Sequence, residues 1–362
     1  MPMHIVHLET GRHLYGGARQ VLMLLEGLAD AGVQSSLVCA ADSAIATAAN
    51  ASRVNVVPMP MKGDLDVLFP RRLNRWLNDV KPDLLHVHSR RGADLWGGLA
   101  ARSTELKTVL TRRVDNPEPP VIGLVKYGMY DRIIAISAAI QEQLVADGAA
   151  ADKLRVVRSA VAVADCQPTW ERSQFLEAFD CEPDALTVAC VAQFIPRKGH
   201  TDLLKAWVSI VREHPRARLL LFGQGPLEDE VRAQIQATGL DSSVRVVGFR
   251  DDLRSFLSCV DLLAHPARRE GLGICLLEAQ AAGVPVVANG VGGIPEVFGQ
   301  GRGGMLIEPG RPDKFAAAVS RLLADADLRN LMGQQGAAYV AEHFSPQTMV
   351  SGNLSVYKEI LG

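Results

Sequence analysis

The sequence has few features of disulfide-stabilised or membrane-spanning proteins. Its six cysteines form no C-x-x-C pair and show no spacing typical of a disulfide framework, which predicts reduced and mostly buried thiols. No apolar run approaches the roughly 20 residues that are needed to cross a bilayer, so we expect any membrane contact to be peripheral. The N-terminus enters an apolar strand without a basic leader, which predicts a cytoplasmic protein.

The sequence has no large excess of positive or negative charge. The net charge is −2, with 22% charged and 48% hydrophobic residues, which excludes a general nucleic-acid binder and a disordered chain. Residues 71–113 nevertheless hold ten Lys or Arg side chains against four Asp or Glu. This local excess predicts contact with an anionic acceptor or with lipid at the inner face of the cytoplasmic membrane, and a solvated basic face is the alternative.

Length and periodicity predict two α/β domains. A chain of 362 residues exceeds one compact core, and short apolar runs alternate with amphipathic stretches in both halves, as in parallel sheets built from βαβ units. The predicted strands are residues 3–8, 34–40, 84–88 and 132–137 in the first half, and 186–192, 217–222, 260–265 and 285–288 in the second. A helix over residues 18–31 is expected to end at Gly32.

The domain boundary is predicted near Asp165. Residues 160–184 lack a clear period and hold two prolines, as a linker would. The first domain is therefore residues 1–165 and the second is residues 166–344. Residues 345–362 are predicted to form a terminal helix, with Ser345 as its cap and Pro346 at its first position.

A glycine-rich loop over residues 9–18 follows the first predicted strand. Gly16 and Gly17 stand where the next helix begins, so the backbone can approach a ligand and the free N–H groups of the helix can meet a phosphate. The spacing is not G-x-G-x-x-G, so the loop does not predict dinucleotide binding, and a plain tight turn is the alternative.

His86 and His88 are two positions apart on a predicted strand, which points both imidazoles to one face. His88 is nearer the carboxyl end, where such sheets bind ligands, and is the better candidate for a functional role. The neighbouring sequence supplies no further metal ligands, so we predict no metal site, and a structural histidine is the alternative.

The strongest signal in the second half is the pair Glu270 and Glu278, which flank a glycine-rich loop and the start of a helix. A carboxylate among core residues is costly unless a partner satisfies it, and ribose or hexose hydroxyls would be suitable partners. The alternative is a capping glutamate and a rim residue. Arg197 and Lys198, at another strand-to-helix turn, can neutralise a diphosphate, and solvated side chains are the alternative.

Taken together in this order, the motifs resemble those of the retaining glycosyltransferases of family 4, over essentially the whole chain. The motifs are Gly16-Gly17, His86-Val87-His88-Ser89, Lys198-Gly199, and the E-x7-E element of Glu270 and Glu278. The resemblance implies the GT-B fold, an α/β architecture of two Rossmann-like domains whose parallel sheets face each other across a cleft. The first domain would bind the acceptor, the second would bind the nucleotide sugar, and the C-terminal helix would cross back to the first domain.

The resemblance also implies roles for individual residues. Gly16 and Gly17 would face the donor phosphates, Lys198 would bind the diphosphate, Glu270 would hold sugar hydroxyls, and Glu278 would bind the ribose. The implied catalytic residues are His88, Lys198 and Glu270. The implied donor-binding set is Gly16, Gly17, Gln193, Arg197, Lys198, Gly225, Glu270, Gly271, Leu272, Gly273 and Glu278. Because the departing phosphate oxygen would take the acceptor proton, no metal ion and no cofactor beyond a UDP, GDP or ADP sugar is expected.

One departure from the family pattern affects the phosphate site. The family often has Gly-Arg where this chain has Ala192-Gln193, which removes a phosphate-binding cation for which Arg197 is a candidate substitute. Arg112 and Arg113, within the basic stretch, predict a phosphorylated or lipid-linked acceptor such as a lipopolysaccharide-core or other envelope glycan. The alternatives are a catalytically silent nucleotide-sugar-binding partner subunit and a GT-B-type sugar-nucleotide epimerase.

Overall fold

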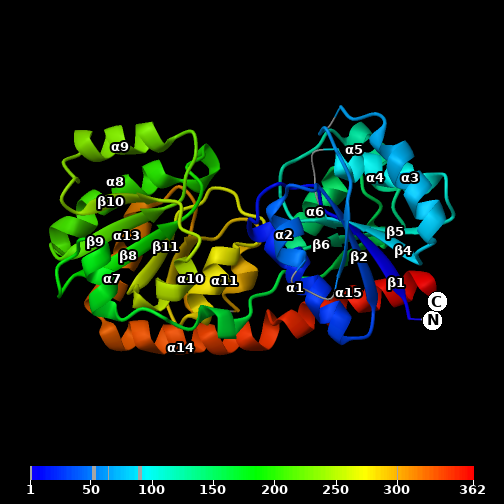
Figure 1. Cartoon of the computed structure of the whole chain (residues 1–362). Helices are drawn as coiled ribbons and strands as arrows, with labels where there is room; N and C mark the ends of the chain where they lie inside the picture. The colour runs from blue at the N-terminus through cyan, green and yellow to red at the C-terminus, as the bar shows by residue number, and fades with distance from the viewer. Residues whose placement is uncertain (1, 51–53, 64, 89–91, 300) are drawn as a thin grey trace. The chain divides into compact units, whose positions relative to one another are not determined.

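The computed structural model describes residues 2–50, 54–63, 65–88, 92–299 and 301–362. Ser89, Arg90 and Arg91, which belong to the histidine motif and the basic stretch, lie outside these residues. The chain divides into unit 1, which is Met1–Ala160 with Pro346–Gly362, and unit 2, which is Val161–Ser345 (Figure 1).

Unit 1 contains a seven-stranded parallel sheet in the order β3-β2-β1-β4-β5-β6-β7. Its strands are β1 (His4–Leu8), β2 (Gln34–Cys39), β3 (Asn55–Pro58), β4 (Leu84–Val87), β5 (Lys107–Arg112), β6 (Arg132–Ala135) and β7 (Leu154–Val156). Its helices are α1 (Gly16–Asp30), α2 (Ala44–Ala49), α3 (Phe69–Val80), α4 (Ala93–Arg102), α5 (Pro120–Gly128), α6 (Ala138–Ala146), the 3-10 helix η1 (Ala151–Lys153) and α15 (Pro346–Leu361). As predicted, Gly32 ends α1, because its left-handed φ of 77° lets the next residue bond back to Leu28.

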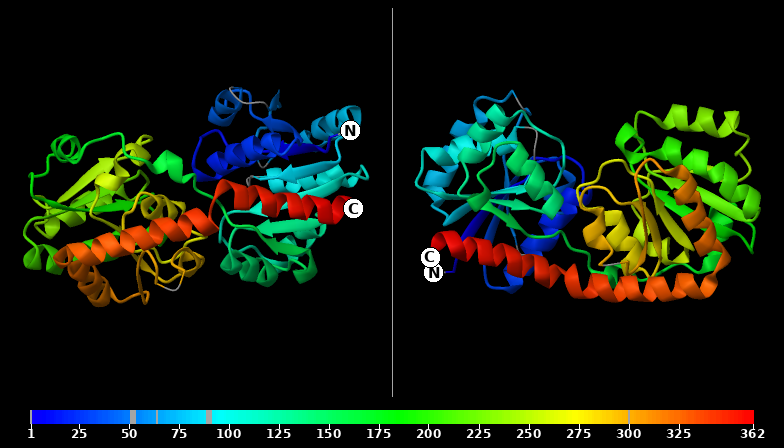
Figure 2. Two further views of the ribbon diagram at one scale, coloured as in Figure 1. Left: turned by 90° about the horizontal axis from the view of Figure 1, so that it is seen from below. Right: turned by 180° about the vertical axis from the view of Figure 1, so that it is seen from behind.

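The helices of unit 1 cover both faces of its sheet. The chain steps one way through the sheet from β1 to β3 and the other way from β4 to β7, so right-handed crossovers place α1 and α2 on one face and α3 to α6 on the other. Contacts agree, since α3 packs on α4 and α4 on α5 (Figure 1). The terminal helix α15 begins at Pro346 as predicted, lies beside α1 (Figure 2), and buries Met349 and Tyr357 in the unit 1 core.

Unit 2 contains a six-stranded parallel sheet in the order β10-β9-β8-β11-β12-β13. Its strands are β8 (Leu186–Val191), β9 (Ala217–Phe222), β10 (Val244–Gly248), β11 (Leu262–His265), β12 (Val286–Asn289) and β13 (Gly304–Ile307). Its helices are α7 (Arg172–Ala178), α8 (His200–Glu213), α9 (Glu228–Ala237), α10 (Leu253–Phe256), α11 (Ile274–Ala281), α12 (Ile294–Val297), α13 (Pro312–Ala324), α14 (Ala326–His343) and the 3-10 helices η2 (Val163–Cys166), η3 (Pro196–Lys198) and η4 (Leu257–Cys259).

Of the predicted linker over residues 160–184, Ala160 belongs to unit 1 and residues 161–184 belong to unit 2. Asp165 lies in η2, and α7 packs Phe175 into an aromatic cluster with Phe179 and Phe256. The packing of these aromatic rings holds the segment against the rest of unit 2. The hydrophobic period of the sequence did not predict this packing.

No helix in the described residues is long and apolar enough to cross a membrane. All six cysteines carry free thiols, and four of them are buried.

Candidate functional site

The predicted site residues gather at one switch point in each sheet. In unit 1, β1 and β4 are neighbours from which the chain leaves in opposite directions, and in unit 2 the same is true of β8 and β11. Ligands of open α/β sheets bind outside the carboxyl ends of strands at such points. Gly16 and His88 follow β1 and β4, while Lys198 and Glu270 follow β8 and β11.

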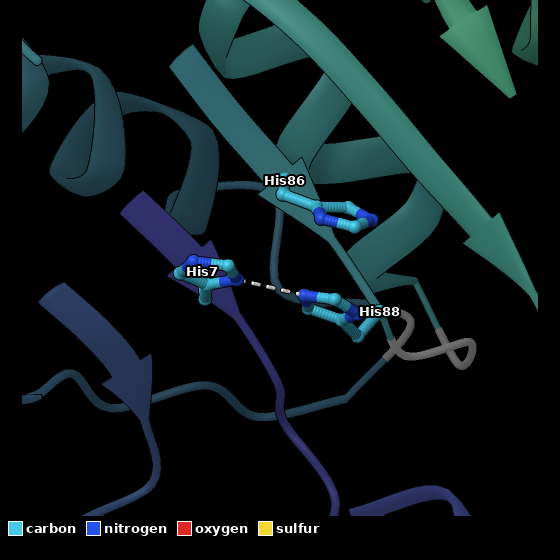
Figure 3. Close-up of side chains that lie close together, drawn as sticks. All are labelled: His7, His86 and His88. Carbon is cyan, nitrogen blue, oxygen red and sulfur yellow. Dashed lines mark hydrogen bonds between the residues drawn. The ribbon is translucent and has the colours of Figure 1, made fainter. Parts of the chain in front are cut away.

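Three imidazoles meet at the unit 1 switch point (Figure 3). The rings of His86 and His88 share one face, as predicted, with centroids 3.8 Å apart. His7, on β1, pairs with His86 in the strand register, and its Nδ1 lies 3.0 Å from Nε2 of His88. The sequence analysis missed His7, although its place on the first predicted strand was a usable signal.

His86 is a structural histidine, which is the alternative that the sequence analysis gave for the pair His86 and His88. Its Nδ1 is 2.6 Å from the Tyr357 hydroxyl and its Nε2 is 2.7 Å from the Thr111 hydroxyl. Both ring nitrogens are therefore bonded, and the imidazole ties α15 to the sheet of unit 1. His88 lies closer to the strand end, where an Arg113 guanidinium nitrogen is 3.5 Å from its Nδ1.

The imidazoles of the cluster are neutral near pH 7. Burial lowers the pKa of His7 to about 3, with a further contribution from His4. Burial also holds the pKa values of His86 and His88 well below the usual range, and neighbouring imidazoles and Arg113 add to the effect. Because Arg113 donates to Nδ1 of His88, Nε2 of that ring carries the proton and donates to His7.

The cluster also has the spacing of a metal site. The ligand atoms of His7, His86 and His88 lie within 4.8 Å of one another. Two observations favour hydrogen bonding instead: hydroxyl groups engage both nitrogens of His86, and the cation of Arg113 lies against His88. A divalent ion would break the hydrogen bonds of His86 with the hydroxyl groups, and the positive charge of Arg113 would repel it.

The start of α1 lies beside Arg113. Gly16 and Gly17 are exposed, Tyr15 at the N-cap makes no side-chain capping bond, and the first turn of the helix has no acidic residue. A Cβ on Gly17 would lie 3.7 Å from Cδ of Arg113, so this guanidinium stem and the helix N-terminus are adjacent. Burial lowers the pKa of Arg113 to about 10, opposed by Glu9, so the side chain remains a cation and the corner suits an anion.

Arg112 is an interior residue. It is 3% exposed, and its guanidinium donates to the Val114 and Asn116 carbonyls and to Glu118 Oε1 at 2.8 Å. Lys126 pairs with the same Glu118 and with Asp94. The predicted role of Arg112 in acceptor binding therefore does not fit its position, because all the charges of this network are used internally.

In unit 2, Lys198, Glu270 and His265 form one cluster. The Lys198 ammonium and His265 Nε2, at 3.0 Å, both bond Oε2 of Glu270, while the Gly271 N–H donates to Oε1 at 3.1 Å. Burial opposes ionisation, but His265 and Lys198 hold the pKa of Glu270 well below its usual range. The carboxylate is charged, and its neighbours are a cation and a neutral imidazole whose own pKa burial lowers.

Glycines permit the close approach that builds this cluster. Gly199 adopts a left-handed φ of 72° directly after Lys198, and a Cβ there would lie 2.2 Å from the Pro266 carbonyl oxygen. Gly292 has a φ of 53°, and its Cβ would lie 2.0 Å from the Glu270 carbonyl oxygen. The first contact holds the turn after β8 against the loop after β11, which brings Lys198 to Glu270, and the second holds the loop after β12 against the same loop.

The N-terminus of α11 faces the same loop. Gly273 is its N-cap, with a φ of 92°, no side-chain cap bonds the first turn, and that turn has no acidic residue. Gly271, Leu272 and Gly273 are buried and carry the chain from Glu270 into the helix. Backbone N–H groups at such a helix start bind anions.

Gln193 and Arg197 lie on the turn between β8 and α8. Gln193 is exposed at the strand end, whereas Arg197 is half-buried and its carbonyl accepts from the Arg268 N–H at 2.8 Å. A Cβ on Gly225 would lie 2.5 Å from the Phe194 carbonyl oxygen, so the turn after β9 lies directly against this segment. The predicted donor residues Gln193 and Gly225 are thus brought side by side.

Glu278 has a protein partner. Arg254, from α10, donates to Oε1 of Glu278 from Nε at 2.8 Å and from a terminal nitrogen at 2.6 Å. The sequence analysis assigned the satisfaction of this carboxylate to sugar hydroxyls alone and missed Arg254. Both bonds use Oε1, which leaves Oε2 for a ligand.

The sequence analysis also missed His265 and His200. His265 ends a predicted strand five residues before Glu270, which was a usable signal. His200 is buried with no hydrogen-bond partner for Nε2 among the described residues, and burial lowers its pKa to about 4. Nothing in the local sequence distinguishes it from a surface helix residue.

Comparisons with known proteins agree with the two units. A family model described as Glycosyltransferase Family 4 matches residues 15–165, and one described as Glycosyl transferases group 1 matches residues 174–339. The GDP-mannose-dependent monoacylated alpha-(1-6)-phosphatidylinositol monomannoside mannosyltransferase of Corynebacterium glutamicum is 36% identical over 171 residues, which cover 45% of this chain and 44% of that protein.

The lipopolysaccharide core biosynthesis glycosyltransferase LpsE of Rhizobium meliloti is 30% identical over 177 residues, covering 49% of this chain and 51% of that protein. The chain thus spans about half the length of these curated relatives. Among solved structures, Anabaena HepE in complex with UDP and glucose has a TM-score of 0.86 at 20% identity, covering 98% of this chain and 99% of that chain. That likeness establishes the fold.

Proposed function

The chain belongs to family 4 of the glycosyltransferases, and from this premise we propose that it transfers a sugar from a nucleotide-sugar donor to a glycan, with retention and without a metal ion. The observation that carries the proposal is the cluster of Lys198, Glu270 and His265 beside the N-terminus of α11. It joins a cation, the backbone N–H groups of a helix start and an ionised carboxylate, which are groups that a diphosphate and sugar hydroxyls require.

In the proposed reaction the donor diphosphate binds Lys198 and the N–H groups at Gly271 to Gly273. These groups stabilise the negative charge that develops on the leaving oxygen. Glu270 accepts hydrogen bonds from donor-sugar hydroxyls, and the departing phosphate oxygen takes the acceptor proton. Arg197 supplies the second cation in place of the residue that Gln193 replaces, and Gly225 borders the nucleotide.

We assign the remaining roles to both units. Oε2 of Glu278 accepts from the ribose, and Gly16 and Gly17 of unit 1 contact the donor phosphates. Neutral His88, whose two ring nitrogens bond Arg113 and His7, lies beside the transferred sugar. The donor is a UDP, GDP or ADP sugar. Similarity to a protein solved with UDP supports a UDP sugar, and similarity to a GDP-mannose-dependent enzyme supports a GDP sugar.

The proposed acceptor is an envelope glycan such as lipopolysaccharide core, reached from the cytoplasmic face of the membrane. Similarity to LpsE and the exposed basic residues of unit 1 support this choice. Of the two predicted acceptor arginines we retain Arg113, because it lies by His88 and the start of α1.

Binding of UDP, GDP and ADP sugars, measured by thermal shift, tests the proposal. We expect one donor to stabilise the wild-type protein and the exposed control Lys205→Met, but not Lys198→Met. Hydrolysis or transfer of that donor, with retention at the anomeric carbon by NMR, would establish a transferase. An epimer as product would establish the epimerase, and tight binding without turnover across a panel of acceptors would establish the silent subunit.

A further inference from the structure

Helix α5 of unit 1 exposes its aliphatic side chains and buries its charged one. Its four aliphatic residues Val121, Ile122, Leu124 and Val125 are between 56% and 77% exposed. Its one charged residue, Lys126, points inward and is 6% exposed. A helix that served only to cover the sheet would bury the aliphatic side chains and expose the lysine.

The inward face of α5 is fixed, so the helix cannot rotate to hide its aliphatic face. Lys126 pairs with Asp94 at 2.9 Å and with Glu118. Gly123 lies so close to the loop after α6 that a Cβ would stand 1.8 Å from the Asp147 carbonyl oxygen. Tyr127 is 1% exposed. Rotation would break a buried ion pair and force backbone atoms together, so the apolar side permanently faces outward.

Neighbouring elements extend this surface. Helix α4 packs on α5 and exposes Leu95 and Leu99, one turn apart. The segment that enters α3 exposes Leu65, Val67 and Leu68. Exposed aliphatic side chains on neighbouring elements of one helical layer are typical of a contact with another molecule or with a membrane.

Exposed cations accompany the apolar residues in the same helical layer. Arg71 and Arg75 stand one turn apart on α3, and Arg102 ends α4. The two helices are joined directly, because Asn74 donates to the Ala100 carbonyl at 2.8 Å. Lipid headgroups of negative charge would attract such cations, while acyl chains would receive the aliphatic side chains.

We propose that this surface, made by α3, α4 and α5 with residues 65–68, binds an anionic lipid bilayer. The α5 aliphatic residues enter the interface between headgroups and acyl chains, and Arg71, Arg75 and Arg102 meet the headgroup phosphates. A protein partner would leave the arginines without a stated counterpart, whereas a bilayer satisfies both the apolar and the basic part. The proposal concerns binding alone and does not depend on the transfer reaction.

Flotation with vesicles tests it, using the full chain without donor or acceptor. We expect wild type to bind vesicles of phosphatidylglycerol and phosphatidylcholine, and the variant V121E/L124E to lose roughly tenfold or more in partitioning. V145E, which places the same charge on a half-exposed valine of α6, should bind like wild type. R71E/R75E should weaken binding and remove its salt dependence, and vesicles of phosphatidylcholine alone should bind less.

Because the substituted residues are exposed, all variants should fold, which circular dichroism and thermal unfolding will check. Equal binding by wild type and V121E/L124E, or no binding by wild type, would overturn the proposal. So would a wild-type dimer in light scattering that V121E/L124E dissociates and that does not bind vesicles, because the surface would then join two copies of the chain.

Discussion

Arg254 donates two hydrogen bonds to a single oxygen of Glu278, from Nε at 2.8 Å and from a terminal nitrogen at 2.6 Å. The two residues come from α10 and α11, and both side chains are largely shielded from solvent. A guanidinium that holds one carboxylate oxygen fixes the direction of the other. The pair therefore presents Glu278 Oε2 in one orientation, as a site for ribose hydroxyls requires.

We predict that Arg254 acts on nucleotide binding through Glu278. Arg254→Leu and Glu278→Gln should each weaken the affinity for the cognate nucleoside diphosphate by roughly tenfold, and the double variant should be little worse than either. Calorimetric titration of the nucleotide measures this coupling. Arg232→Leu, which breaks an exposed pair with Glu228 in the same unit, serves as the control. Full affinity in Arg254→Leu would show that Glu278 needs no partner to bind ribose.

A second prediction concerns the backbone that carries Lys198. Gly199→Ala should lower the free energy of unfolding by about 3 kcal/mol, because a left-handed φ of 72° and a contact of 2.2 Å with the Pro266 oxygen both oppose a side chain. Gly239→Ala has a similar φ of 66° in open space and should cost only about 1 kcal/mol. Urea denaturation compares the two. Equal losses would show that the contact with Pro266 relaxes freely.

Much of this arrangement could be predicted from local pattern. The apolar runs that became β1, β8 and β9 are long and bounded by turns, and the two-residue period placed His86 and His88 on one face. The glycines at α1 and α11 were found because glycine at a strand-to-helix turn is a local signal. The sequence analysis missed the strands β3, β5, β7, β10 and β13. Of these, β3 and β7 have four and three residues, which are too few to show a period.

The partners of the site residues depend on tertiary contact and could not be predicted. His265 and Lys198 meet at Glu270 only because β8 and β11 are neighbours in the sheet. Arg112 and Arg113 are adjacent and alike in sequence. At the end of β5, however, the Arg112 side chain lies in a buried ion network, while the Arg113 side chain lies beside His88. The strand register that brings His7 to His86 is equally invisible in one sequence.

Metal removal provides a third prediction. Since both nitrogens of His86 bond hydroxyl groups and Arg113 lies beside His88, prolonged treatment with EDTA should change neither the melting temperature nor nucleotide binding. Elemental analysis of the purified protein measures bound zinc directly. A stoichiometric zinc ion that His7→Ala releases would show that the three imidazoles are ligands, and would replace the hydrogen-bonded arrangement inferred above.

The last prediction is loss of stability in acid. Burial lowers the pKa of His7 to about 3 and of His200 to about 4 from the usual 6.5. Between the folded and unfolded pKa values the unfolded chain binds more protons, so the free energy of unfolding must fall as pH falls below 6.5. Each such imidazole contributes up to about 1.4 kcal/mol per pH unit in this range.

Urea denaturation between pH 7.5 and pH 5 measures this slope. His7→Gln and His200→Phe each remove one buried imidazole whose Nε2 has no partner among the described residues, so each variant should show a shallower loss of stability in acid. His13→Gln replaces an exposed histidine of unit 1 and should retain the wild-type slope. If the slope is unchanged in both buried variants, these imidazoles are protonated within the folded protein and burial does not hold them neutral.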